Sequence, residues 1–176
     1  MSIAKVKISG TASLLMNRMP QATAEKVVKK KTDVIDPKQD ALKKAYHDEK
    51  LGFYLPSDTI EGCLREAGKN IKAGRGTLKK TVLASVFCKT DKVKLDYRNN
   101  EVDSRFSIHP STGNGVMCNR MRFDGWKAEF ELEFDADRVD VKTLEELIIE
   151  GGKVIGMGSY RPKFGRYKLD EFKVTK

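Results

Sequence analysis

Hydrophobic and polar residues alternate along several short segments of this 176-residue chain. The clearest is WKAEFELEF at residues 126–134, where Trp, Ala, Phe, Leu and Phe fall on one side and Lys and Glu on the other. A period of two is typical of a strand with one buried face. Further strands are predicted at residues 3–8, with continuation toward Met16, and at 52–56, 91–98, 103–110 and 167–174.

Two other segments have helical periodicity. In residues 57–74, Ser57 or Asp58 is a candidate N-cap, Glu61 completes a capping box, and apolar residues recur every three to four positions until GRGT ends the helix. In residues 140–152, Asp140 is the expected cap and the Gly151–Gly152 pair the expected end. Residues 77–88 fit either a short helix or a buried strand, and we favour the helix.

The order of these elements predicts an α+β fold. Reduced to its regular parts it is β-α-β-β-α-β, the ferredoxin-like or RRM-like arrangement in which two helices cover one face of an antiparallel sheet. We expect residues 1–176 to form a single domain. Residues 17–51 are too long for an ordinary connection and predict an insertion after the first strand, with a short helix near residues 37–48.

Composition limits the class of protein. Hydrophobic residues make up 39% and charged residues 34% of the chain, as in globular proteins. The cysteines at 63, 88 and 118 are too widely spaced for a zinc site with paired ligands, so we expect reduced, buried thiols and neither metal nor cofactor. The sequence contains neither a signal peptide nor a long apolar run, which predicts a cytoplasmic protein without a membrane partner.

The charge is high and unevenly placed. The formal net charge is +9, and residues 65–94 contain nine Lys or Arg against two acids, whereas residues 124–150 are acidic. This distribution predicts one positive and one negative face. A basic face fits a nucleic-acid partner, because each cation on a phosphate releases condensed counterions. A merely solvated basic surface is the alternative.

The segment GGKVIGMGSYRPKFGRY at residues 151–167 combines flexibility with positive charge. Glycines at 156 and 158 would let backbone N–H groups approach phosphate oxygens, and Tyr160 or Phe164 would stack on a base. The charge comes from Lys153, Arg161, Lys163 and Arg166. The alternative is a flexible surface hairpin. A P-loop is excluded, because no glycine precedes the required Lys-Ser/Thr pair.

Three segments together resemble one family. KVKISGTASLLMNRM (5–19), GFYLPSDTIEGCLREAGKN (52–70) and the glycine-rich segment (151–167) are similar, in order, to parts of the RAMP superfamily of CRISPR-associated proteins, in its backbone-forming branch. The resemblance implies an RRM-like core that binds single-stranded RNA without sequence preference. It further implies copies that stack as a filament, with residues 17–51 as a thumb-like insertion, and other effector-complex subunits as partners. A compact phage-like member that binds single-stranded DNA is the alternative.

Additional cations are candidates for phosphate contact. Arg65 and Lys69 share a face of the first predicted helix, and Lys72 lies one turn beyond. A solvated helix face would explain them equally well. The remaining candidates are Arg18, Lys29, Lys30, Lys31 and Arg75.

A catalytic alternative rests on a few acids and histidines. Some members of the resembled branch cut RNA with an aspartate after the first strand, and Asp33, Asp36 and Asp40 lie in that region, which would make the protein a metal-dependent endoribonuclease. Turn formation and helix capping explain the same acids. His47 and His109 are a second, metal-free candidate pair. We expect binding without turnover.

Overall fold

The computed structural model describes residues 1–18, 36–108 and 113–175. Its main sheet has the strand order β12-β1-β11-β8-β4-β3, and β7 also pairs with β11. The bounds of these strands are β1 Ser2–Gly10, β3 His47–Asp48, β4 Gly52–Pro56, β7 Val86–Cys88, β8 Lys92–Asp96, β11 Lys127–Phe134 and β12 Tyr167–Thr175. A three-stranded sheet joins β2 (Leu14–Met16), β10 (Gly115–Asp124) and β9 (Asn99–Ile108), in that order.

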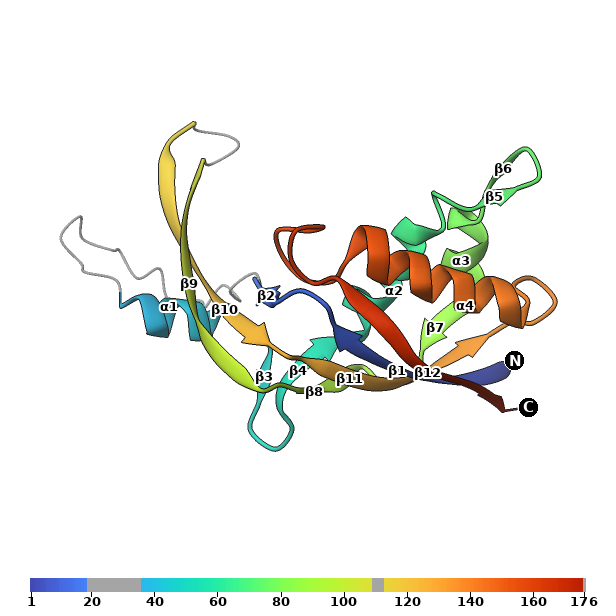
Figure 1. Ribbon diagram of the computed structural model, residues 1–176, viewed down its shortest axis with the longest axis horizontal. Helices are drawn as coiled ribbons and strands as arrows, with labels where there is room; N and C mark the ends of the chain where they lie inside the picture. The colour runs from blue at the N-terminus through green and yellow to red at the C-terminus, as the bar shows by residue number, and fades with distance from the viewer. Residues whose placement is uncertain (19–35, 109–112, 176) are drawn as a thin grey trace, which may run out of the picture.

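The centre of the molecule confirms the α+β, ferredoxin-like prediction. Strand β1 lies between β12 and β11, both antiparallel to it, and β7 and β8 extend the sheet beyond β11. Helices α2 (Ser57–Ala67) and α4 (Val141–Glu150) lie on the same face of this sheet, as Figure 1 shows. The chain order β1-α2-β7/β8-β11-α4-β12 is therefore the expected β-α-β-β-α-β.

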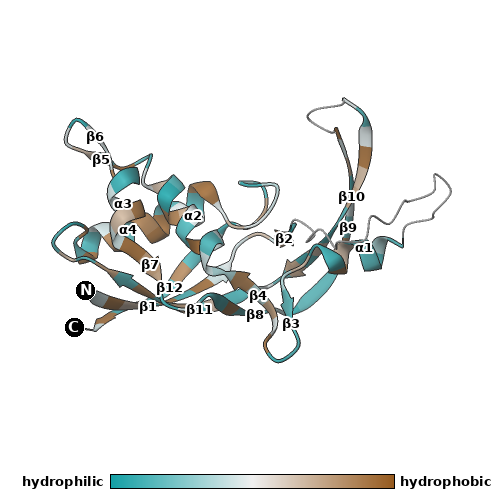
Figure 2. Ribbon diagram, turned by 180° about the vertical axis from the view of Figure 1, so that it is seen from behind, coloured by the Kyte–Doolittle hydropathy of each residue, from teal (hydrophilic) through white to brown (hydrophobic). Residues whose placement is uncertain are grey.

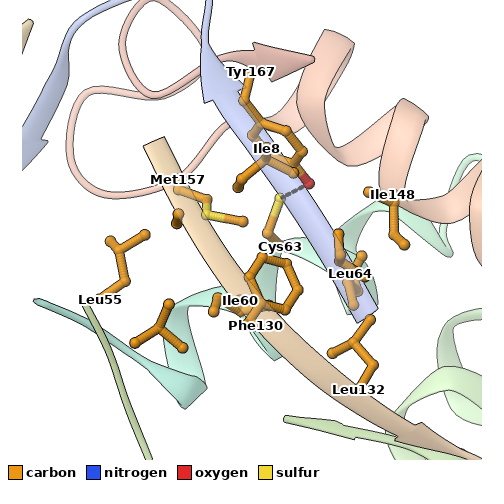
Figure 3. Close-up of a cluster of buried hydrophobic side chains, with 14 of the residues drawn as sticks. Ile8, Leu55, Ile60, Cys63, Leu64, Phe130, Leu132, Ile148, Met157 and Tyr167 are labelled. Carbon is orange, nitrogen blue, oxygen red and sulfur yellow. Dashed lines mark hydrogen bonds between the residues drawn. The ribbon is translucent and has the colours of Figure 1, made fainter. Parts of the chain in front are cut away.

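The core lies between the helices and the sheet. The alternation of β11 places Phe130, Leu132 and Phe134 against the helices, and all three are buried. Close to this cluster, Cys63 Sγ of α2 lies 3.7 Å from the Tyr167 hydroxyl of β12 (Figure 3). Cys63 Sγ also donates to the Gly151 carbonyl at 3.5 Å. Figure 2 shows hydrophobic residues gathered where the helices meet the sheet. The hydrogen bond from Cys63 to Gly151 joins the glycine-rich segment to the core.

The outer face of the sheet is a cross-strand network of opposite charges. Lys7 of β1 pairs with Glu129 at 3.6 Å and with Glu171 at 3.2 Å, and Lys5 pairs with Glu131 at 3.4 Å. Register explains these pairs, since Lys5 lies opposite Glu131 and Lys7 opposite Glu129. Two of the three acids of β11, Glu129 and Glu131, which belong to the segment predicted to form a negative face, are thus paired with lysines of neighbouring strands.

Two helix starts differ from each other. Asp140 caps α4 as expected, with its carboxylate accepting from Thr143 N at 2.9 Å. Helix α2 forms as expected but without its capping box, because Glu61 instead accepts from Cys88 N of β7 at 2.8 Å, and Ser57 N donates to the Asp91 carbonyl. Glu61 therefore joins the helix to the sheet.

Other boundaries need correction. The segment expected to be a helix at residues 77–88 is α3 (Lys79–Ser85) followed by β7. The Gly151–Gly152 pair does not end α4, which runs on into one π-helical turn, η1 (Gly151–Ile155). These glycines are buried against Tyr167, where a Cβ on Gly152 would lie 2.3 Å from the Tyr167 carbonyl oxygen.

The opening strand is also interrupted. It ends at Gly10, where a Cβ would meet the Trp126 indole, and the chain re-enters strand structure in the other sheet as β2. The expected strand at 103–110 starts earlier, as β9, and β10 was not predicted. Of residues 17–51, the described part includes α1 (Pro37–Lys43), shorter than expected, and β3. No helix among the described residues has the length and hydropathy to span a membrane.

Candidate nucleic-acid interface

The glycine-rich loop is folded tightly rather than left free. Ser159 N donates to the Leu15 carbonyl at 2.8 Å, Gly165 N to the Ser13 carbonyl at 2.8 Å, and Met157 N to the Gly165 carbonyl at 2.9 Å. Residues 156, 158 and 165 all have φ near +75°, a left-handed conformation that favours glycine. The loop is thereby anchored to β2.

Close backbone approach explains two of these glycines. A Cβ on Gly158 would lie 2.4 Å from the Leu15 carbonyl oxygen, and one on Gly165 would lie 1.8 Å from the Met157 carbonyl oxygen. The N–H of Gly156 is also used within the chain, since it donates to Gly151 O at 2.8 Å. The groups that approach the glycines are therefore parts of the protein itself.

The β9–β10 hairpin lies beside this loop and adds arginines to it. Register places Glu101, Asp103 and Arg105 on the same hairpin face as Arg122 and Arg120. The guanidinium of Arg105 lies 4.7 Å from the Phe164 ring centre and 5.9 Å from that of Tyr160, and Arg120 lies 4.7 Å from Tyr160. These are cation–π distances. The hairpin and the loop thus meet through arginines and aromatic rings.

Carboxylates satisfy two of the three arginines on this face. Asp103 accepts from Arg105 Nε at 2.5 Å and Nη2 at 2.8 Å, and this pairing raises the pKa of Arg105. Arg122 pairs with Glu101 at 3.0 Å and with Asp124 at 3.1 Å. Arg120 is 7% exposed, and its buried Nε and Nη1 atoms have no hydrogen-bond partner within residues 1–18, 36–108 and 113–175.

A pocket of about 380 Å³ opens where α2, β2 and the loop meet. Arg65 of α2 and Arg161 of the loop both line it, together with Gly158 and Ser159. Neither arginine has an ion pair among the residues that the structure describes. Two cations separated by about a hundred positions in the sequence are therefore brought to one concave site.

The other three cations of the glycine-rich segment lie elsewhere. Lys153 and Arg166 line a different pocket of about 610 Å³, which runs between α4 and β12 and includes Glu145 and Glu171. Lys163 is exposed on the loop. The segment therefore contributes its charge to two separate pockets.

The remaining predicted cations are dispersed. Helix α2 ends at Ala67, so Lys69 is beyond the helix, where it pairs with Glu66. Lys72 lies on β5 (Lys72–Ala73), not one helical turn farther, and Arg75 lies between β5 and β6 (Gly76–Thr77), on a hairpin remote from the loop (Figure 1). Arg18 N donates to the Lys44 carbonyl at 2.6 Å. Lys29, Lys30 and Lys31 lie outside the described residues.

The candidate catalytic acids have structural contacts where they are described. Asp36 caps α1 by accepting from Lys38 N at 2.9 Å. Asp40 accepts from Lys44 at 2.6 Å and from Asn119 of β10 at 3.1 Å. His47 is packed edge-on against Phe53, at 4.9 Å between ring centres. Asp33 and His109 lie outside the described residues, and the described part of the chain has no cluster of three metal-ligating side chains.

Sequence reasoning missed Arg105, Arg120 and Arg122. Strand β10 reads GVMCNRMRFD, which lacks the alternation that identified the other strands, because both of its faces are partly covered. The signal that was present is the spacing of Arg120 and Arg122, two apart, which places both on one face of any strand.

Comparison with known proteins identifies the fold. No family model matches the sequence, and no curated protein matches it. Among solved structures, a chain of the cryo-EM structure of the Type III-B Cmr-beta bound to cognate target RNA is similar, with a TM-score of 0.57 and 13% sequence identity. The likeness covers 99% of this chain and 61% of that one, so this chain spans about three fifths of its neighbour's length. It establishes a shared fold.

Proposed function

We propose that the protein binds a single RNA strand, without sequence preference, across the surface formed by the glycine-rich loop, α2 and the β9–β10 hairpin. The observation that carries this proposal is the pocket that both Arg65 and Arg161 line, together with Asp58 and Glu66, although neither arginine forms an ion pair among the described residues. Two unpaired guanidinium groups at a concave site suit phosphate oxygens, which guanidinium binds through paired hydrogen bonds.

The choice of RNA has two supports. The fold neighbour comes from a complex bound to target RNA, and the resemblance to the backbone-forming RAMP branch implies the same ligand. Base identity would be ignored, because arginines on phosphates carry no sequence information. Single-stranded DNA offers the same phosphates and is the alternative that the first experiment separates.

That experiment is purification at moderate salt, followed by extraction of any bound nucleic acid and separate digestion with ribonuclease and deoxyribonuclease. We expect ribonuclease-sensitive material. Deoxyribonuclease-sensitive material would transfer the proposal to single-stranded DNA. Absence of nucleic acid, together with no binding of added oligonucleotides at low salt, would refute it.

We further propose that copies assemble along the strand, as the RAMP resemblance implies, within an effector complex. Static light scattering with oligonucleotides of increasing length tests this. The expected result is a mass that rises stepwise with oligonucleotide length. A constant ratio of one protein to one oligonucleotide at every length would rule out assembly.

A further inference from the structure

Arg120 is a buried cation of the interface that forms no ion pair among the described residues. It extends from the middle of β10, is 7% exposed, and its Nε and Nη1 have no hydrogen-bond partner in that part of the chain. Its cross-strand neighbour is Asp103, whose two carboxylate oxygens both accept from Arg105. The one carboxylate directly opposite Arg120 is therefore occupied by another arginine.

The surroundings of Arg120 favour an anion rather than a second cation or an apolar group. Two arginines share one aspartate on this stretch of the hairpin face, so the local charge is positive. Burial strengthens the attraction between this charge and any anion that replaces water there. The Tyr160 ring contributes only its negative face to Arg120, at 4.7 Å between guanidinium carbon and ring centre.

Tyr160 is placed as a cover over this group. Its φ of 57° is in the left-handed region, which a tyrosine seldom occupies, and the residue is 39% exposed while its ring contacts Arg120. Backbone bonds hold the loop on both sides of it, from Ser159 N to Leu15 O and from Phe164 N to Tyr160 O. Side-chain rotation of Tyr160 would uncover Arg120 without moving these anchors.

We propose that Arg120 is a phosphate-binding site, covered by Tyr160 in the free protein and occupied by one phosphodiester group of the bound strand. This inference rests on the proposed function and assigns to it a contact that lies deeper than the Arg65–Arg161 pocket. The unpartnered Nε and Nη1 of Arg120 lie on different edges of the guanidinium group, because Nη1 is on the Cδ side. Each atom therefore offers one charge-assisted donor to a phosphate oxygen, and the two do not form a side-by-side pair.

The test compares wild type with Arg120→Met, which keeps an unbranched side chain against Tyr160 but removes the charge. Binding of a fluorescein-labelled single-stranded RNA is followed by anisotropy over a range of NaCl concentrations. The plot of log K against log salt has a negative slope, and loss of one phosphate contact decreases the magnitude of this slope by about 0.7. The matched control is Arg138→Met, an exposed arginine in the β11–α4 connection, for which an unchanged slope is expected.

Thermal unfolding separates a binding role from a structural one. A phosphate site predicts that Arg120→Met unfolds at the wild-type temperature or above, because an unpaired buried charge is removed. A lower unfolding temperature with an unchanged salt slope would overturn the proposal. If Arg120→Met does not fold, Arg120→Gln serves instead: its amide lacks the positive charge, so weaker RNA binding is expected, and wild-type affinity would count against the site.

Inorganic phosphate distinguishes failure of this inference from failure of the proposed function. At constant ionic strength, replacing chloride by phosphate should raise the unfolding temperature of wild type by more than that of Arg120→Met, which keeps the Arg65–Arg161 pocket and the general stabilising effect of phosphate. If wild type responds in this way yet binds no RNA, Arg120 is an anion-binding site, but the proposal that its anion is a phosphate of a bound RNA strand is refuted. If RNA binds and neither the slope nor the phosphate response depends on Arg120, the site is refuted and the proposed function stands.

Discussion

The backbone N–H of Ser159 donates to the carbonyl of Leu15 at 2.8 Å, which joins the glycine-rich loop to β2. Beside this bond, Gly158 has a φ of +75° and no room for a side chain, because a Cβ would lie 2.4 Å from the same carbonyl oxygen. The position of the loop, and with it the Arg161 side of the pocket, therefore depends on glycine at residue 158.

Gly158→Ala is expected to destabilise the protein and weaken RNA binding together. Left-handed backbone costs an alanine about 1–2 kcal/mol, and the collision with Leu15 adds to this. Urea unfolding and anisotropy titrations measure the two effects. Gly74→Ala is the matched control: Gly74 has a φ of +57° but nothing within 4 Å of its Cβ position. Gly74→Ala should lose only the stability that the left-handed backbone costs, and its RNA affinity should be unchanged. Equal losses of stability in the two variants would contradict the close contact between Gly158 and Leu15.

Removing both arginines of the pocket should change the salt dependence of binding. If Arg65 and Arg161 each contact one phosphate, the double variant Arg65→Ala, Arg161→Ala should decrease the magnitude of the slope of log K against log salt by about 1.4. The parallel double variant Lys153→Ala, Arg166→Ala tests the separate pocket beside β12. Equal decreases would extend the strand path to that pocket, and an unchanged slope in the first variant would exclude Arg65 and Arg161 from the interface.

Tyr160 is expected to act through its ring. Tyr160→Ala should weaken RNA binding by about 1–3 kcal/mol, the range for an aromatic contact with a base, because the ring that rotates off Arg120 is expected to stack on a base of the bound strand. The salt slope should stay nearly constant, because no charge is removed. Tyr160→Phe keeps the ring over Arg120 and should bind as wild type does. A comparable loss in the phenylalanine variant would assign the effect to the hydroxyl instead.

Stability is expected to fall at alkaline pH. Burial raises the pKa of the Cys63 thiol to about 11 and raises the pKa of Tyr167 as well. Between the unfolded thiol's ordinary pKa near 8.5 and the folded value, the folded state retains a proton that the unfolded state releases, so stability is complete below about pH 8 and decreases above it.

The loss attributable to Cys63 is about 3 kcal/mol once the pH exceeds 11, at about 1.4 kcal/mol per pKa unit. Urea unfolding from pH 7 to 11 measures it. Cys63→Ala should have lower stability at pH 7 and a smaller decrease with pH. An identical pH dependence in this variant would show that other groups are responsible.

The regular core could be predicted because its signals are local. Alternation identified β11, and helical periodicity together with Asp140 identified α4. Glu61 shows the limit of local reasoning: its spacing from Ser57 and Asp58 fits a capping box, but a backbone N–H 27 residues away, that of Cys88, takes its carboxylate. Tertiary contacts of this kind leave no periodic pattern in the sequence from which they could be predicted.

The candidate site was predictable on the loop and not on the hairpin. Arg161 and Tyr160 are prominent because glycines and cations surround them in sequence. Arg120 lies in a segment without clear alternation, and the aromatic ring that contacts it, that of Tyr160, lies forty positions later in the sequence. The sequence predicts that the glycines let phosphates approach the backbone. In the structure, Gly158 and Gly165 instead allow close packing against the protein's own backbone. Only the fold brings these groups into one place.

The paired charges on the outer face of the sheet have a consequence for how a polyanion meets the protein. Because Lys5 and Lys7 are matched by glutamates across the strands, that broad surface produces little long-range field. The net charge of +9 must therefore be expressed elsewhere on the molecule. The electrostatic field would turn an approaching nucleic-acid strand toward the unmatched arginines before the strand touches the protein. A productive orientation would thus be selected during diffusion. Raising the ionic strength would therefore decrease the association rate more than it would increase the dissociation rate.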